Sequence, residues 1–133
     1  MPAGQYSFTL EQGTTLDFTL EYLDSESVPV DLTDFTGRMH IREKKDSDNI
    51  ICSLSTTLDA DGTGLDFTPP SGSLGENLPT TSGSIRVFIS AASSSNFNFQ
   101  KAFYDLEIVS GSTYPVVTRV VEGRIKLSKE VTK

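Results

Sequence analysis

The sequence has few of the residues on which most catalytic and metal sites depend. Its 133 residues include one cysteine, Cys52, one histidine, His40, and no tryptophan. A single cysteine excludes a disulfide within the chain and a zinc site built from several thiolates. Because Cys52 lies among Ile50, Ile51 and Leu54, we expect it to be a buried apolar residue and not a reactive thiol.

Long hydrophobic runs are also missing. No apolar stretch approaches the roughly 18 to 20 residues that a membrane helix needs. The first residues, MPAGQYSF, do not form a basic segment followed by an apolar one, which is the pattern of a secretion signal. We therefore expect a soluble product that stays in the cytoplasm after synthesis.

Basic residues are scarce as well. Eleven Lys and Arg face 18 Asp and Glu, which gives a formal charge of −7. The longest basic cluster, Arg42, Lys44 and Lys45, is interrupted by Glu43. Binding to nucleic acid requires concentrated positive charge to neutralise phosphates, and binding to anionic membranes requires it too. Both classes of partner are therefore disfavoured.

What the chain does have is a series of short segments in which apolar and polar residues alternate. This period of two is typical of strands that are buried on one face. Residues 102–109 and 118–127 are the clearest pair, and the turn-forming SGSTYPVV between them predicts an antiparallel hairpin. Further strands are predicted at 6–10, 14–23, 38–43, 50–54, 65–68 and 84–90.

The remaining segments connect these strands within one domain, residues 1–133. Residues 69–83 are rich in Pro, Gly, Ser and Thr and predict a long irregular loop, while 91–97 predict one or two helical turns and 128–133 a polar tail. The predicted fold is all-β: an immunoglobulin-like antiparallel β-sandwich of about 7–9 short strands, favoured over a closed barrel. The alternation leaves the strand order open.

Candidate chemistry is sparse. His40 is predicted on the outer face of a strand with no nucleophile assigned to it. The segment Asp59–Gly64 superficially resembles a calcium loop, but it lacks a third alternate acid and the bidentate Glu, so a plain turn is predicted. The pairs Asp105 with Glu107 and Asp17 with Glu21 are predicted on solvent-facing sides of strands. We expect no enzyme, no catalytic residue, no metal and no cofactor.

Outward-facing aromatic residues are the remaining candidates for a function. Phe88 is predicted opposite the core face of its strand, and Phe97, Phe99 and Tyr114 lie in or beside loops. Several such residues together indicate a surface that another chain covers, and local packing beneath the helical turn is the alternative. Strand pairing with a partner near the N-terminal segment would add two more interface residues, Tyr6 and Phe8.

Three segments carry a resemblance to a known group of proteins. GQYSFTLEQGTTLDFTLEY, VDLTDFTGRMHIREK, and AFYDLEIV followed by VTRVVEGRIKLSKEVT together extend from Gly4 to Thr132, with Asp61 to Ser84 not covered. In this order they resemble small virion proteins of tailed bacteriophages, and they look similar to the N-terminal β-sandwich of phage baseplate upper proteins. These motifs are mainly strand and turn residues and assign no catalytic group.

The resemblance implies a non-enzymatic virion protein that is assembled in the host cytoplasm. Its partners would be other virion proteins and copies of itself in a symmetric ring or trimer, and its place would be the tail, baseplate or neck. The alternatives are a capsid decoration protein, or a receptor- or glycan-binding module on the particle surface. A bacterial adhesin domain is disfavoured by the absent secretion signal.

Overall fold

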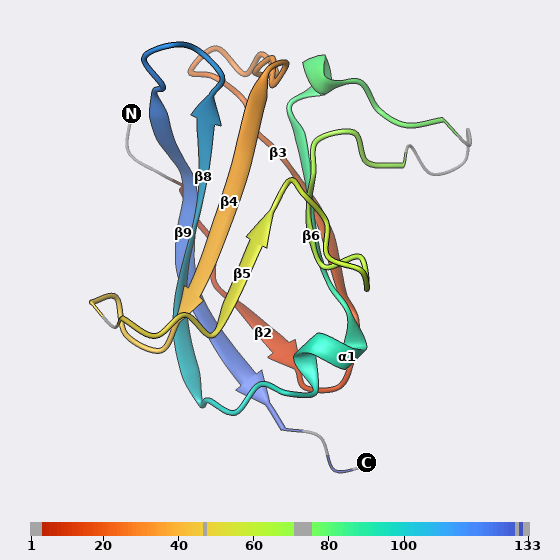
Figure 1. Ribbon diagram of the computed structural model, residues 1–133, viewed down its shortest axis with the longest axis vertical. Helices are drawn as coiled ribbons and strands as arrows, with labels where there is room; N and C mark the ends of the chain where they lie inside the picture. Colours follow the sequence, from red (N-terminus) through yellow and green to blue (C-terminus); the bar gives the residue numbers. More distant parts are fainter. Residues whose placement is uncertain (1–3, 47, 71–75, 130, 132–133) are drawn as a thin grey trace.

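Two β-sheets packed face to face form the described part of the chain (Figure 1). The computed structural model describes residues 4–46, 48–70, 76–129 and 131. The larger sheet has the order β1-β9-β8-β4-β5, with β2 also paired to β9, and the smaller sheet has the order β3-β7-β6. The bounds are β1 Gly4–Gln5, β2 Phe8–Glu11, β3 Leu16–Glu21, β4 Phe35–Arg42, β5 Cys52–Ser55, β6 Gly64–Asp66, β7 Ser84–Ile89, β8 Lys101–Ser110 and β9 Val117–Ser128. The prediction of an all-β sandwich is confirmed.

The predicted C-terminal hairpin lies at the centre of the larger sheet. β8 and β9 are antiparallel, with Ala102 opposite Ile125 and Leu106 opposite Val121. The register shifts after Leu106, so that Val120 is an extra residue on β9 and forms a β-bulge. Strand β4 pairs antiparallel with the other edge of β8 and carries β5 on its own far edge.

The N-terminal segment departs from the predicted antiparallel arrangement. Both β1 and β2 run parallel to β9, with Gly4 opposite Val121 and Phe8 opposite Ile125. The larger sheet is therefore mixed. Alternation along a strand defines which side chains share a face, but it contains no information about the direction of the neighbouring strand.

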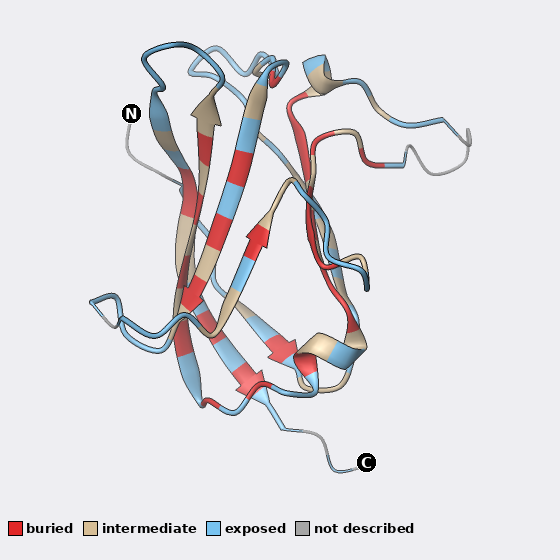
Figure 2. Ribbon diagram, viewed as in Figure 1, coloured by how far each residue is buried: buried red, intermediate tan, exposed pale blue. Residues whose placement is uncertain are grey.

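The core lies between the sheets and comes from the alternating positions that the sequence indicates. Met39 and Ile41 of β4 are fully buried, while Arg38 and Arg42 on the same strand face outward, an alternation that Figure 2 shows along the ribbon. The inner faces of β8 and β9 supply further core residues, and the smaller sheet contributes from β7 and β6; they are Ala102, Tyr104, Leu106, Ile108, Val121, Ile125, Leu127, Ile85, Val87, Ile89 and Leu65.

Strand β4 begins three residues earlier than the sequence predicts. The turn ends at Asp34, which has a left-handed backbone with φ of 65°. Gly37 is then part of the strand, and the ring of Phe67 occupies the space of its missing side chain, 2.9 Å from an ideal Cβ position. The glycine therefore serves close packing between the sheets and not the turn.

One end of the sandwich is closed by helix α1, Ala91–Ser94, and the segment after it. Ser90 caps the helix by accepting a hydrogen bond from the Ser93 backbone N–H. Phe97 and Phe99 follow and are only 5% and 4% exposed, with ring centroids 5.8 Å apart. The expectation that they belong to a partner surface is therefore wrong. They pack into this chain's own core, because the segment folds back across the open end.

The long connection between β6 and β7 is only partly described. Pro70 and Asn77 form an isolated bridge, and a 3-10 turn occupies Thr80–Ser82 before β7 begins. Residues 71–75 of the predicted 69–83 loop, and residues 130 and 132–133 of the predicted tail, lie outside the described residues. No helix in the described part is long and apolar enough to span a membrane.

The parallel N-terminal pairing leads to a stability prediction at Gly123. An ideal Cβ at this position would collide with the carbonyl oxygen of Tyr6, a backbone atom that cannot rotate away. We expect Gly123→Ala to lower the free energy of unfolding by about 2 kcal/mol or more and to release residues 4–11 from β9. Urea unfolding measures the first effect and amide hydrogen exchange the second.

Gly4→Ala is the matched control. The nearest atom to its ideal Cβ is the Val120 carbonyl oxygen at 3.6 Å, an ordinary contact. We expect this variant to remain within about 0.5 kcal/mol of the wild type. Equal unfolding curves for the two variants would contradict the close approach at Gly123.

Candidate functional site

An apolar groove lies between the two sheets on the side where β1 faces β3. Its volume is about 570 Å³. The walls come from the N-terminal strand, from most of β3 and its extension, and from the bulged part of β9; the residues are Gly4, Gln5, Tyr6, Phe18, Thr19, Leu20, Glu21, Tyr22, Leu23, Arg119, Val120 and Val121. The bulge contributes because it places two consecutive valines on this side of β9.

Aromatic rings form one end of the groove. The centroid of Tyr6 is 5.7 Å from Phe8 and 5.9 Å from Phe18, and Phe8 contacts Tyr104 at 5.4 Å. Tyr6 remains 49% exposed despite these contacts. Ring pairs at these separations add stability beyond the area that they bury, so the groove has a fixed aromatic floor with one accessible ring.

The hydroxyl of Tyr104 fixes the position of Tyr6 in this aromatic group. It donates a 2.5 Å hydrogen bond to the backbone carbonyl of Tyr6, at the point where the chain passes from β1 to β2. Burial raises the pKa of Tyr104, so the phenol remains protonated and can donate at any physiological pH. Because this hydrogen bond fixes the Tyr6 backbone, the Tyr6 ring stays at the mouth of the groove.

The strand beside the groove has an unpaired edge. Within the part of the chain that the structure describes, β3 is the terminal strand of its sheet and pairs only with β7. The Tyr22 N–H donates to the Gly83 carbonyl, so by the alternation of an antiparallel ladder Leu20, Phe18 and Leu16 also bond to β7. The backbone N–H and C=O groups of the intervening residues, Asp17, Thr19 and Glu21, consequently point away from β7. They are available to a further strand.

Charged side chains mark the solvent face of this edge strand. Asp17 accepts two hydrogen bonds from Arg86, at 2.9 and 2.8 Å, and these bonds lower its pKa. Glu21 is exposed next to the groove. Charged side chains on an edge strand limit its pairing with unrelated strands. A strand that adds to β3 must therefore be compatible with the carboxylates of Asp17 and Glu21.

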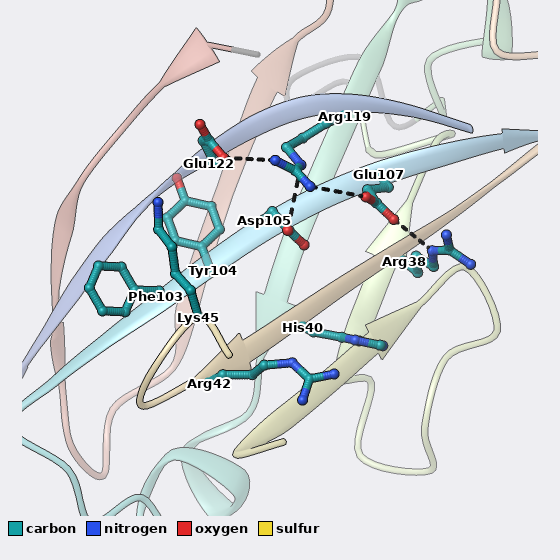
Figure 3. Close-up of a pocket in the computed structure, with 10 residues that line it drawn as sticks. All are labelled: Arg38, His40, Arg42, Lys45, Phe103, Tyr104, Asp105, Glu107, Arg119 and Glu122. Carbon is teal, nitrogen blue, oxygen red and sulfur yellow. Dashed lines mark hydrogen bonds and ion pairs between the residues drawn. The ribbon is translucent and has the colours of Figure 1, made fainter. Parts of the chain in front are cut away.

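A second hollow, about 370 Å³, lies on the outer face of the larger sheet (Figure 3). Arg119 stands among three carboxylates there, 3.5 Å from Asp105, 3.8 Å from Glu107 and 3.2 Å from Glu122. Glu107 is also 2.9 Å from Arg38. These side chains are between a fifth and a half exposed, so each ion pair contributes little stability and the network is a solvated surface.

The same hollow offers no arrangement for acid–base or nucleophilic chemistry among the described residues. Asp105 and Glu107 are on the solvent side of β8, as predicted, and guanidinium groups contact both. His40 is on the outer face of β4, as predicted, opposite Asp105 in the register. On this partly exposed surface, Arg119 binds Asp105, while Arg38 and Arg119 bind Glu107.

The Asp59–Gly64 segment is a turn, as predicted. The Gly62 N–H donates to the Asp59 carbonyl, and Asp61 accepts hydrogen bonds from Ser90 at 2.5 Å and Ser93 at 2.7 Å. These hydroxyls hold the pKa of Asp61 well below its usual range. The carboxylate thus ties the turn to the start of α1, and no group of metal-ligating side chains occurs among the described residues.

The structure separates the aromatic residues that the sequence singles out. Tyr6 lines the groove and Phe8 stacks against it, while Phe88 lies on the outer face of the smaller sheet with the Arg86 guanidinium 4.8 Å from its ring centroid. Tyr114 is 86% exposed in the loop between β8 and β9. These four do not form one surface. Sequence reasoning missed two groove residues, Phe18 and Tyr22. Their pattern in the sequence is that of ordinary inward-facing strand residues.

A scan against models of protein families finds no match to the chain, and no curated protein matches its sequence.

Cys52, the first residue of β5, allows a direct test of its own environment. It is half-buried and packs against the core, and burial raises the pKa of its thiol to about 11. A pKa of about 11 in place of 9.0 reduces the thiolate fraction at pH 8 about a hundredfold. We expect alkylation by iodoacetamide to be slower by about this factor in the folded protein than in urea, and to accelerate as the pH approaches 11. Similar rates in both states would refute the burial.

Proposed function

We propose that this chain is a non-enzymatic structural protein of a tailed-bacteriophage virion. It acts as a multi-copy adaptor in the tail, baseplate or neck and links neighbouring virion proteins. Two lines support the proposal: the resemblance of the three sequence segments to small virion proteins, and a fold in which Asp105 and Glu107, the paired carboxylates of the larger sheet, are bound by guanidinium groups. The observation that carries it is the unpaired edge of β3 beside an apolar groove.

The edge and the groove together suit the addition of a strand from another protein. Main-chain groups of Asp17, Thr19 and Glu21 would supply the hydrogen bonds, and the groove would take every second side chain of the added strand. Tyr6 would be covered in the process, since it stands half-exposed at the groove mouth. Repetition of this contact around a symmetric ring would let a small interface per copy give a stable assembly.

The presence of the protein in particles tests the proposal directly. We expect mass spectrometry of purified virions to detect the chain in several copies per particle, stoichiometric with a ring component. Its absence from particles, while present in the infected cell lysate, would overturn the virion role.

A variant at the edge strand tests the mode of attachment. The N–H of Thr19 is not used in pairing with β7, so Thr19→Pro removes a donor from the free edge without breaking the β3–β7 ladder. We expect particles grown with this variant to lose most of the protein. Thr19→Val keeps the backbone donor and nearly the same volume, so it is the control and should be retained. Thermal melts of both variants establish that they fold.

The second candidate is a capsid decoration protein or a receptor- or glycan-binding module of the particle surface. The specific observation in its favour is Tyr114, whose ring is 86% exposed at the tip of the β8–β9 loop and free to stack on a sugar. A glycan array discriminates the two candidates. A hit that is lost in Tyr114→Ala would favour receptor binding over the adaptor role.

A further inference from the structure

Charge is unevenly distributed along and across the sandwich. The first basic residue of the sequence is Arg38, and residues 21–37 contain five carboxylates and no Lys or Arg. These carboxylates are Glu21, Asp24, Glu26, Asp31 and Asp34, and all are exposed. They lie where β3 ends and β4 begins, at one end of the sandwich. We call these five residues the acidic end.

Exposed apolar side chains gather at the same end. Val28 is 50% exposed within the acidic segment. The β8–β9 loop adjoins this segment, because Gly111 packs against the carbonyl of Asp34. That loop carries Tyr114 at 86% and Val116 at 61% exposure. The acidic end therefore combines negative charge with an uncovered apolar surface, a combination typical of a contact with another protein.

Positive charge gathers on the outer face of the larger sheet at its other end. Arg42, Phe103 and Arg124 lie opposite one another across three adjacent strands. The side chains of Lys45 and Arg124 stand over the Phe103 ring, 5.6 and 5.7 Å from its centroid. Lys101 and Lys126 lie directly opposite each other, two residues away from Phe103 and Arg124 on the same two strands. We call this surface, Arg42, Lys45, Lys101, Phe103, Arg124 and Lys126, the basic face.

Four basic side chains of the basic face are not neutralised within the described part of the chain. Lys45, Lys101, Arg124 and Lys126 take part in none of its ion pairs, whereas the carboxylates nearer the middle of the sheet are bound by Arg38 and Arg119. Two lysines directly opposite each other on one face of a sheet repel. An anionic partner would relieve this repulsion, and Phe103 offers it an apolar contact.

The two surfaces cannot meet within one molecule. Strand β4 connects them, since it begins directly after Asp34 and ends at Arg42. Seven steps along a strand separate its ends by about 23 Å. In Figure 1 the loop before β4 and the arrowhead of β4 lie at opposite ends of the sandwich.

We propose that the acidic end of one copy docks on the basic face of the next. This inference rests on the proposed function for the presence of several copies side by side, and it assigns the surfaces that join them. Because the two surfaces differ, the contact is heterologous and repeats head to tail, which produces a ring when the rotation closes. The net charge of −7 does not prevent it, since at physiological salt charges further apart than about 8 Å are screened while contacting pairs are not.

Complementary charge reversal tests the contact in the purified protein. One variant reverses the basic face, Lys45→Glu with Lys126→Glu, and the other reverses the acidic end, Glu21→Lys with Glu26→Lys. Sedimentation velocity at 0.15 M salt is followed up to about 1 mM protein, the range needed for a weak contact. We expect the wild type to self-associate, and each variant alone to associate at least about tenfold more weakly. The mixture of the two variants should form heterodimers, because one matched interface remains between them.

The control reverses two carboxylates outside the acidic end, Glu11→Lys with Asp59→Lys, and changes the net charge by the same amount as the acidic-end variant. It should associate like the wild type, and circular dichroism should show all variants folded. A wild type that stays monomeric at every concentration, or variants that fail to associate when mixed although the wild type associates, would overturn the proposal. If the protein stays monomeric and its basic face binds polyglutamate or single-stranded DNA, the proposal is overturned and that face belongs to another class of partner. None of these outcomes bears on the presence of the chain in virions.

Discussion

The packing of a six-stranded sheet against a three-stranded one is the constraint on which the rest of the structure depends. The apolar layer between the sheets is complete at its centre, where Met39, Leu106 and Val87 are almost fully buried. On the side where β1 faces β3, the bulge in β9 turns apolar side chains into the space between the sheets. The groove is therefore built from the edges of both sheets and is not an addition to the fold.

The sequence predicted which residues face the core far better than it predicted how strands are connected in space. The alternation in β4, β8 and β9 was correct because burial on one face of a strand requires it. The parallel attachment of β1 and β2 could not be read from it, since partner choice depends on contacts that are distant in sequence. The start of β4 was predicted three residues too late, because Gly37 belongs to the strand and makes room for Phe67.

The candidate site was predictable only in part, and for a related reason. Tyr6 was singled out as an interface residue, because an N-terminal strand at a sheet edge is a common place for a partner, and the structure places it in the groove. Phe97 and Phe99 were assigned to the surface because loop residues are usually exposed, and the closure of the sandwich end by their segment is a tertiary effect. The groove itself depends on how the edges of the two sheets and the bulge in β9 come together, which no local pattern reports.

The parallel pairing also constrains how the chain reaches its native state. Phe8 lies opposite Ile125, 117 positions further along, so β1 and β2 have no partner until β9 has been synthesised. Until then, Phe8 and Phe18 must remain in water or in a transient complex. Closure over so long a separation is slow, and the exposed aromatic segment makes the nascent chain a natural client for a chaperone that binds extended apolar strands.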